Sequence, residues 1–317
     1  MNSITGSRTT STFLEFHASS KPDETAVITE TDAGVRQWFT WAELDELVNK
    51  TGNWLLQQGL THADAIALHL PNSLELFLMW LAAGKTGTVA VPVDPGSTVN
   101  ELRYIVAHSE ARLVITQVFT ADAARAACEG CSMVRRLVAT SLAEPFAASA
   151  LGEEINSQPS ARPPGEVLPL NVAGLLYTSG TTGRPKGVML THAAYLYGAE
   201  VFVRSTALTP CDRHLIVLPL HHAAAQCHAM VPSLVAGAST VIVERFSVSR
   251  FLQQAIRYGA TRAALFATPI RLLLKRYAGL PAPRTPLQLA TFAQNLSRKS
   301  WRSGAPGSAY HYYSSGA

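Results

Sequence analysis

From Leu175 to His192 the chain reads Leu-Leu-Tyr-Thr-Ser-Gly-Thr-Thr-Gly-Arg-Pro-Lys-Gly-Val-Met-Leu-Thr-His, and the rest of the sequence can be placed around this segment. The apolar runs on its two sides, 172–177 and 188–190, are typical of buried strands. Thr191 stands where a side-chain oxygen can cap a helix that begins near His192. The segment therefore predicts a strand, a polar loop, a second strand and a helix, in that order.

The loop between the two strands carries groups that suit phosphate. Its glycines permit backbone angles and close approaches that a Cβ would forbid, and a lysine supplies a mobile point charge. These groups are the hydroxyls of Thr178, Ser179, Thr181 and Thr182, the glycines Gly180, Gly183 and Gly187, and Lys186. The loop is not a Walker A motif, because Lys186 is followed by Gly187 and Val188. A plain Gly/Ser/Thr turn is the alternative, but such turns rarely combine all these groups.

Composition narrows the class of protein. The chain has 317 residues, 47% hydrophobic and 15% charged, which is typical of a globular rather than a disordered chain. The net charge is +4 without a basic block, so nucleic-acid binding has little support. The N-terminus lacks the apolar core of a signal peptide. The most apolar segment, 74–83, is too short to span a bilayer. We expect a soluble, cytoplasmic protein.

Four cysteines do not indicate a disulfide framework. Cys128 and Cys131 form a Cys-Glu-Gly-Cys pair, which is compatible with a redox pair or half of a zinc site. The sequence has no second pair at metal-binding spacing, and Cys211 and Cys227 stand apart. We therefore expect the pair to have no redox or metal role.

The first half of the chain alternates helical and strand patterns. Thr40-Trp-Ala-Glu43 is a capping box that predicts a helix through about Leu56. Further on, the pattern predicts strands at 65–70, 88–93 and 113–116 and helices at 74–84 and 102–108. Strands that alternate with helices favour parallel pairing through right-handed crossovers.

The second half continues the same alternation. The segment 151–168 is rich in Pro, Gly, Ser and Glu and is expected to be a linker. Beyond it, the pattern predicts strands at 215–218, 239–243 and 263–266 and helices at 229–236, 249–258 and 270–277. The sequence therefore predicts an α/β fold with layered, parallel-rich sheets flanked by helices, and subdomains at about 1–160 and 169–297.

The loop at 175–192 resembles the signature loop of the adenylate-forming (AMP-binding) enzymes, which include acyl-CoA synthetases, luciferases and peptide-synthetase adenylation domains. The segments 40–44, 68–72, 85–89 and 91–92 resemble the N-terminal pattern of that family. The segments 226–228, 237–238, 243–246 and 289–297 resemble most closely its crotonobetaine/carnitine–CoA ligase branch. The resemblance covers about residues 10–297 and implies the large N-terminal domain of an adenylate-forming enzyme.

This resemblance implies a reaction and its co-substrates: ATP-dependent adenylation of a small carboxylic acid, followed by thioester formation with coenzyme A. The loop would grip the β- and γ-phosphates of ATP, and Thr178 would lie near Mg²⁺. The residues that inherit the phosphate-binding role are Thr178, Ser179, Gly180, Thr181, Thr182, Gly183 and Lys186. Such a reaction depends on positioning and charge stabilisation rather than on a nucleophile of the protein.

A second motif, Pro-Leu-His-His at 219–222, resembles the next motif of the family, whose last residue lies beside the carboxylate of the acyl substrate. That role falls on His222. A metal or acid–base site is an alternative, but no Asp or Glu stands nearby in the sequence, and Cys227 and His228 do not fall at a recognised ligand spacing. A structural histidine at a strand end is a further alternative. The absence of a carboxylate in 221–226 disfavours an amino-acid substrate, whose ammonium would be buried unpaired.

The pattern changes after Ser297. Residues 298–317 show neither helical nor strand periodicity, whereas the family continues into a Tyr-Gly-x-Thr-Glu motif and a small C-terminal domain that carries a catalytic lysine. The segment 298–317 resembles an out-of-frame tail. We therefore expect a C-terminally truncated ligase with impaired activity. A non-catalytic nucleotide-binding remnant and an adenylation module that loads a carrier protein remain as alternatives.

Overall fold

Two six-stranded sheets organise the molecule in the computed structural model, which describes residues 6–178, 184–278 and 284–292. The first sheet has the strand order β6-β5-β3-β4-β7-β8 and the second β12-β11-β9-β10-β1-β2. The strands of the first sheet are β3 (Ala65–His69), β4 (Val89–Val93), β5 (Leu113–Gln117), β6 (Arg136–Thr140), β7 (Val172–Thr178) and β8 (Lys186–Thr191). Those of the second sheet are β1 (Thr25–Glu30), β2 (Arg36–Thr40), β9 (Arg213–Ile216), β10 (Ser239–Val243), β11 (Arg262–Leu265) and β12 (Leu289–Phe292).

Strand pairing follows the same plan in both sheets. Neighbouring strands are parallel, except that β8 pairs antiparallel with β7 at one edge and β2 pairs antiparallel with β1 at the other. The parallel-rich α/β fold predicted from the sequence is confirmed. Because parallel strands end at the same edge of a sheet, the segments that follow them gather there.

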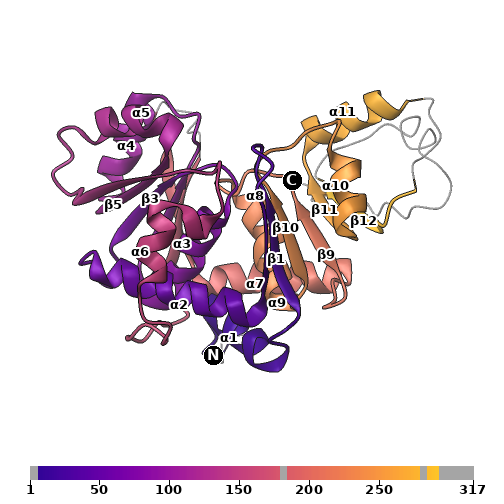
Figure 1. Ribbon diagram of the computed structural model, residues 1–317, viewed down its shortest axis with the longest axis horizontal. Coiled ribbons are helices and arrows are strands. Elements are labelled where there is room, and N and C mark those ends of the chain that lie inside the picture. Colours follow the sequence, from indigo (N-terminus) through magenta and orange to yellow (C-terminus); the bar gives the residue numbers. More distant parts are fainter. Residues whose placement is uncertain (1–5, 179–183, 279–283, 293–317) are drawn as a thin grey trace.

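Helices form three layers around these sheets (Figure 1). The layer between the sheets contains α1 (Thr10–Ser20), α2 (Trp41–Gln57), α3 (Leu74–Thr86), α6 (Ala150–Asn156), α7 (His192–Thr206) and α9 (Val231–Ala236). The outer face of the first sheet is covered by α4 (Val99–His108) and α5 (Ala121–Cys128), and that of the second by α10 (Phe251–Tyr258) and α11 (Ala267–Tyr277). Short helical turns are α8 (Ala223–Ala225), η1 (Val118–Thr120), η2 (Phe146–Ala148) and η3 (Gln226–Met230).

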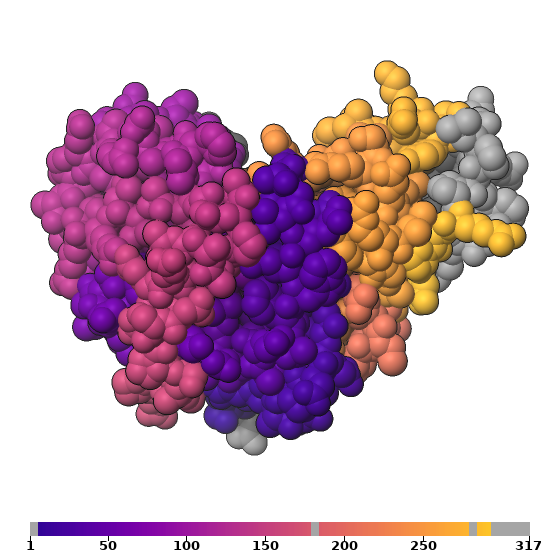
Figure 2. Space-filling view, viewed as in Figure 1, coloured from indigo at the N-terminus to yellow at the C-terminus, as the bar shows by residue number. Residues whose placement is uncertain are grey.

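Alternation along single strands explains the layers. In β3, Ile66 and Leu68 pack into the central cluster, whereas Ala65 and Ala67 pack against the outer helices α4 and α5. A strand that is buried on both faces reads as a continuous apolar run, as parallel strands do. Figure 2 shows the two resulting lobes, with a notch between the magenta surface around α4 and α5 and the orange surface around α10.

Several helix boundaries differ from their predicted positions for local reasons. The helix α4 begins at Val99 rather than 102, because Thr98 and Glu101 form a capping box that the sequence analysis passed over. The helix α11 begins at Ala267, so Pro269 lies in its first turn, where a missing N–H costs nothing. The expected linker at 151–168 begins with the helix α6, which Ser149 caps.

The sheets do not divide where the expected subdomain boundary lies. The strands β1 and β2 belong to the second sheet, together with strands from residues 213–292. The strands β7 and β8, which follow the expected boundary, belong to the first sheet. The chain thus begins in the second sheet, builds all six strands of the first and then returns to the second, so the change of composition at 151–168 does not separate the two sheets.

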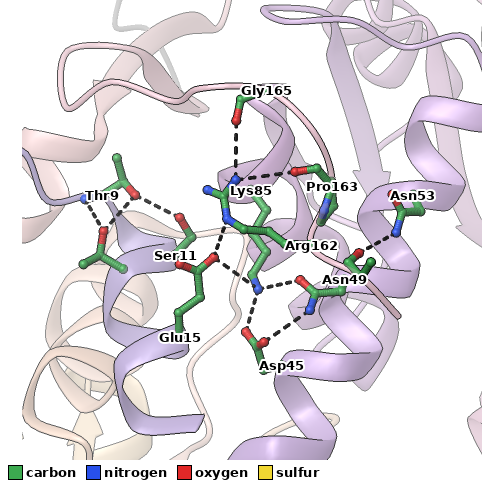
Figure 3. Close-up of polar contacts among 12 residues, drawn as sticks. Thr9, Ser11, Glu15, Asp45, Asn49, Asn53, Lys85, Arg162, Pro163 and Gly165 are labelled. Carbon is green, nitrogen blue, oxygen red and sulfur yellow. Dashed lines mark hydrogen bonds and ion pairs between the residues drawn. The ribbon is translucent and has the colours of Figure 1, made fainter. Parts of the chain in front are cut away.

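Lys85 anchors the helices of the central layer (Figure 3). Its side chain is fully buried on α3, and its Nζ donates to Asp45 Oδ1 at 2.5 Å and Asn49 Oδ1 at 2.6 Å, both on α2. Glu15 Oε1 on α1 lies 3.4 Å from the same Nζ and also accepts from Arg162 Nε at 2.8 Å. A buried ammonium is tolerated only when it is paired and hydrogen-bonded in this way. The network fixes α1, α2 and α3 against one another in the layer between the two sheets.

No helix in the part of the chain that the structure describes has both the length and the apolar character to cross a membrane.

Candidate functional site

The hairpin formed by β7 and β8 positions the phosphate-binding residues predicted from the sequence. Thr178 is the last residue of β7 and Lys186 the first of β8, and the two are direct partners across the antiparallel pair. Both side chains are exposed. The predicted residues Ser179, Gly180, Thr181, Thr182 and Gly183 lie outside the described residues. The structure therefore brings a hydroxyl and an ammonium to the two sides of the loop's base.

Aromatic side chains from α4 and β7 hold the base of this loop. The Tyr104 hydroxyl donates to Pro185 O at 3.0 Å, and the Arg184 guanidinium lies 5.6 Å from the centre of the Tyr104 ring. His108 Nδ1 lies 2.8 Å from the Tyr177 hydroxyl, so α4 also contacts the strand before the loop. These contacts tie both sides of the loop to one helix.

Gly187 is required by close packing across the hairpin. A Cβ built at this position would lie 3.1 Å from Leu175 Cδ1 and 3.3 Å from Tyr177 Cζ. Both neighbours also pack against the cluster that contains the buried residues of α4. The close approach predicted for Gly187 is confirmed, and it keeps the strand that begins at Lys186 against β7.

The described residues at this end of the hairpin suit a polyphosphate. An exposed lysine and a threonine hydroxyl supply a cation and a hydrogen-bond donor, which phosphate oxygens accept. Within residues 6–178, 184–278 and 284–292 there is no cluster of three His, Cys, Asp or Glu side chains able to hold a metal.

The second predicted site residue, His222, lies beyond the end of β9. It is exposed, its backbone N–H donates to Pro219 O at 3.0 Å, and it stands directly before α8. The neighbouring imidazole of His221 lies 4.3 Å away between ring centres, with its own side chain 10% exposed. Burial, followed by the repulsion of a charge on His222, lowers the pKa of His221 to about 4. His221 is therefore neutral at pH 7, and His222 is the histidine that solvent or a ligand reaches.

The fold brings a carboxylate close to these histidines, although the two lie far apart in the sequence. Asp94, which follows β4, places Oδ2 3.9 Å from His221 Nε2. The buried His69 at the end of β3 also faces Asp94, and burial lowers the pKa of its imidazole. Because both imidazoles are neutral at pH 7, these contacts are not ion pairs there. No Asp or Glu lies close to the histidine pair in the sequence, but the fold brings Asp94 next to His221.

Asn72 joins the ends of the two sheets at this place, and the sequence analysis noted it only as part of a family pattern. Its Nδ2 donates to Leu218 O at 2.9 Å and to Val243 O at 3.1 Å, and its Oδ1 accepts from Leu220 N at 2.7 Å. Asn72 follows β3 of the first sheet, while Leu218 and Val243 follow or end strands of the second. The carboxyl ends of strands from both sheets thus meet next to the 219–222 segment.

The structure describes all four cysteines. All four are free thiols, and burial raises the pKa of Cys128 to about 11. A thiol with so high a pKa carries little thiolate at neutral pH and is a poor nucleophile or metal ligand.

A polar hollow of about 490 Å³ opens at the opposite edge of the second sheet. Thr25, Arg213 and Ser239, the first residues of β1, β9 and β10, line it together with Asp23 and Cys211. Since none of the predicted site residues lies there, we place the candidate site at the carboxyl edge and not in this hollow.

Comparison with known proteins identifies relatives of this chain. The chain is 31% identical over 282 residues to a crotonobetaine/carnitine–CoA ligase of Escherichia coli (strain SE11), in a match that covers 87% of this chain and 54% of that ligase. The chain thus spans about half the length of the curated relatives it matches.

Solved structures share the fold. The inhibitor-bound N-terminal domain of FACL13 from Mycobacterium tuberculosis superposes with a TM-score of 0.81 at 23% identity, covering 93% of this chain and 72% of that one. The anthranilate CoA ligase AuaEII in complex with anthranoyl-AMP gives a TM-score of 0.83 at 20% identity, with 94% and 58% coverage. The AMP-binding enzyme family matches residues 14–305, which extends past the boundary expected at Ser297. The chain therefore belongs to the AMP-binding enzyme family.

Proposed function

We propose that this chain carries the nucleotide-binding and acyl-binding part of an ATP-dependent carboxylate–CoA ligase that acts on a small carboxylic acid. The observation that carries the proposal is the pairing of Thr178 with Lys186 at the end of a hairpin, at the edge where the 219–222 segment also lies. Family membership and the ligase relative support the same reaction class.

The reaction has two balanced steps. In the first, a carboxylate oxygen of the substrate attacks the α-phosphorus of ATP, the bond to the pyrophosphate leaving group breaks, and an acyl-adenylate forms. In the second, the sulfur of coenzyme A attacks the acyl carbon, AMP leaves, and the thiol proton passes to solvent. Lys186 and Thr178 would neutralise and orient the phosphates, which is how a site without a nucleophile lowers such a barrier.

The remaining proposed roles follow from position. Residues 179–183 would complete the phosphate grip together with Thr178 and Lys186. Thr178 would help to hold Mg²⁺, which would supply positive charge to the phosphates. His222, which is exposed beside the joint between the sheets, would contact the substrate carboxylate. Its neutral neighbour His221 would pack behind it and carry no charge.

The first test is direct binding of ATP. Isothermal titration of the purified protein with ATP and Mg²⁺ is expected to show one saturable site, and the same titration with GTP measures selectivity. Binding is a sounder first measure than turnover because the chain spans 54% of the ligase relative. A folded protein that binds no ATP would contradict the proposal.

The second test separates a ligase from a nucleotide-binding remnant. Carboxylate-dependent exchange of labelled pyrophosphate into ATP, measured with a panel of small carboxylic acids, is expected to depend on the acid and to be lost in His222→Ala. ATP binding without any exchange would favour the remnant. Exchange combined with acylation of a carrier protein, and none of coenzyme A, would favour an adenylation module.

A further inference from the structure

Leu220, two residues before His222, is held at both of its peptide groups by side chains from two other places in the chain, Asn72 after β3 and Gln226 in η3. Its N–H donates to Asn72 Oδ1 at 2.7 Å, and its C=O accepts from Gln226 Nε2 at 2.6 Å. Leu220 and Gln226 are fully buried, and Asn72 is 4% exposed. The backbone of the 219–222 segment therefore has a fixed position and not merely a buried one.

The Asn72 side chain uses both the donor and the acceptor of its amide in hydrogen bonds to backbone groups. Both donated hydrogen bonds go to carbonyls at the ends of strands in the second sheet, Leu218 O and Val243 O, and its oxygen takes the single N–H of Leu220. Aspartate has the same shape but cannot donate, and alanine would leave three buried backbone groups without their partner. Asn72 itself directly precedes Ser73, the cap of α3, so it is anchored to the first sheet and the central layer.

Gln226 extends this connection to the hairpin. Its Oε1 accepts from the Tyr195 hydroxyl at 2.5 Å. Tyr195 lies on α7, which begins directly after β8, and a Cβ built on Gly174 of β7 would lie 2.7 Å from the Tyr195 hydroxyl. A continuous set of buried contacts thus runs from β7 through Tyr195 and Gln226 to Leu220.

We infer that Asn72, supported by the Tyr195–Gln226 pair, is a positioning residue: it sets the distance between the phosphate-binding hairpin and the acyl-binding segment 219–222. The four residues Asn72, Tyr195, Leu220 and Gln226 are called the Leu220 clamp below. This inference rests on the proposed function, because the two ends of the site matter together only if one ligand spans them. It assigns no contact between Asn72 and a substrate.

The test compares an acyl-bearing ligand with ATP. Hexanoyl-sulfamoyladenosine, a non-hydrolysable acyl-adenylate mimic, lacks the β- and γ-phosphates assigned to the hairpin but extends from the α-phosphate position to the acyl end, whereas ATP reaches the hairpin and not the acyl end. In Asn72→Ala we expect the affinity for the mimic to fall about tenfold to 100-fold, since a misplacement of about 1 Å carries such a cost, while the affinity for ATP changes less than about twofold.

Asn53→Ala is the matched control. Asn53 also donates two hydrogen bonds from its Nδ2 to backbone carbonyls, those of Pro159 and Ala161 at 2.8 Å each, but it lies on α2 and away from the clamp. We expect it to lower stability without changing the ratio of the two affinities. Tyr195→Phe, which removes one hydroxyl and keeps the ring, carries the same test if Asn72→Ala does not fold.

Histidine NMR of the ligand-free protein supplies a second readout, independent of binding. In Asn72→Ala and in Tyr195→Phe, the imidazole signals of His221 and His222 are expected to shift, while those of His17 and His62 remain. Unchanged signals for His221 and His222, or an equal loss of affinity for ATP and the mimic, would overturn the inference. A wild-type protein that binds neither ligand contradicts the proposed function, and the NMR comparison still decides the role of Asn72.

Discussion

The hairpin end and the Leu220 clamp form the two sides of one candidate site, yet they are built in opposite ways. At the hairpin end, Thr178 and Lys186 are exposed, and their position comes from strand pairing and from aromatic contacts with α4. In the clamp, the side chains are buried, and their position comes from hydrogen bonds between residues up to 171 positions apart. The lysine that is proposed to contact phosphate is thus exposed to solvent, whereas the residues that fix the geometry of the site are buried.

This contrast has an energetic reason. An exposed lysine adds little to folding and keeps its full charge for a ligand. A buried amide must be fully hydrogen-bonded or it destabilises the protein. Changes at the hairpin end should therefore alter ligand binding and leave stability intact, whereas changes in the clamp should alter both.

The largest expected effect is on stability in the clamp. Gln226→Ala removes a fully buried side chain and leaves the Leu220 carbonyl and the Tyr195 hydroxyl unpaired. We expect the free energy of unfolding to fall by about 3 kcal/mol, from the unpaired polar groups and the cavity together. Urea denaturation measures it. A loss below about 0.5 kcal/mol would show that the clamp is not rigid.

At the hairpin end, Lys186→Ala is expected to weaken ATP binding about tenfold to 100-fold, because charged hydrogen bonds of this kind contribute about 1.5–3 kcal/mol. The urea midpoint should remain that of the wild type, since Lys186 is exposed. Lys275→Ala, an exposed lysine in the last turn of α11, is the matched control and should bind ATP normally. Equal binding by both variants contradicts the role of Lys186.

Acid should destabilise the folded protein through its buried histidines. Burial lowers the pKa of His221 and of His192 to about 4, and that of His214 to about 3. Because these folded-state values lie below the unfolded value of about 6.5, the stability they contribute is complete above pH 6.5 and is lost as the pH falls toward 4. The loss should be at most about 1.4 kcal/mol per pH unit for each histidine.

Buried Glu75 acts in the opposite direction. Burial raises its pKa to about 7, so its contribution is complete below its unfolded value of about 4.5 and is lost as the pH rises through 7. Urea midpoints at pH 5, 6 and 7 in the wild type and in His192→Asn should show a weaker acid-side decline in the variant. An identical pH dependence of the midpoint in the wild type and in His192→Asn does not fit a contribution from His192.

The smallest expected effect concerns the support of the loop. Tyr104→Phe removes the hydrogen bond to Pro185 O and keeps the ring beneath Arg184. We expect ATP affinity to fall about threefold to tenfold, in keeping with the loss of about 1 kcal/mol for one hydrogen bond. Tyr197→Phe, on an exposed tyrosine of α7, should leave ATP affinity unchanged. Identical ATP titration curves for both variants would show that the Tyr104 hydroxyl of α4 does not support the loop.

Local features of the fold were predictable because their causes are local. The capping box of Thr40 and Glu43 starts α2, and the Thr191 side chain caps α7 by accepting from Ala194 N at 3.1 Å, as the sequence indicated. The parallel pairing of β3, β4 and β5 also follows from the alternation of helices and strands. The hairpin was the most readable part, since its charged and hydroxyl residues lie within one short segment.

The clamp and the strand order across the sheets were not predictable in this way. Val27 of β1 pairs with Thr240 of β10, and no local pattern in either strand specifies its partner. Asp94 and His221 are 127 positions apart in the sequence and 3.9 Å apart in the fold. The same holds for Asn72, whose three backbone partners lie on segments that only the folded chain brings together. Sequence reasoning found the side of the site made by one segment and missed the side made by several.

A crystal structure of the protein with bound hexanoyl-sulfamoyladenosine tests most directly whether the two sides form one site. With pyrophosphate added to the crystals, the account predicts that Lys186 or Thr178 contacts the pyrophosphate and that His222 contacts the acyl end of the ligand. Binding in the polar hollow lined by Asp23, Cys211 and Arg213, or contact with only one of the two sides, would contradict it.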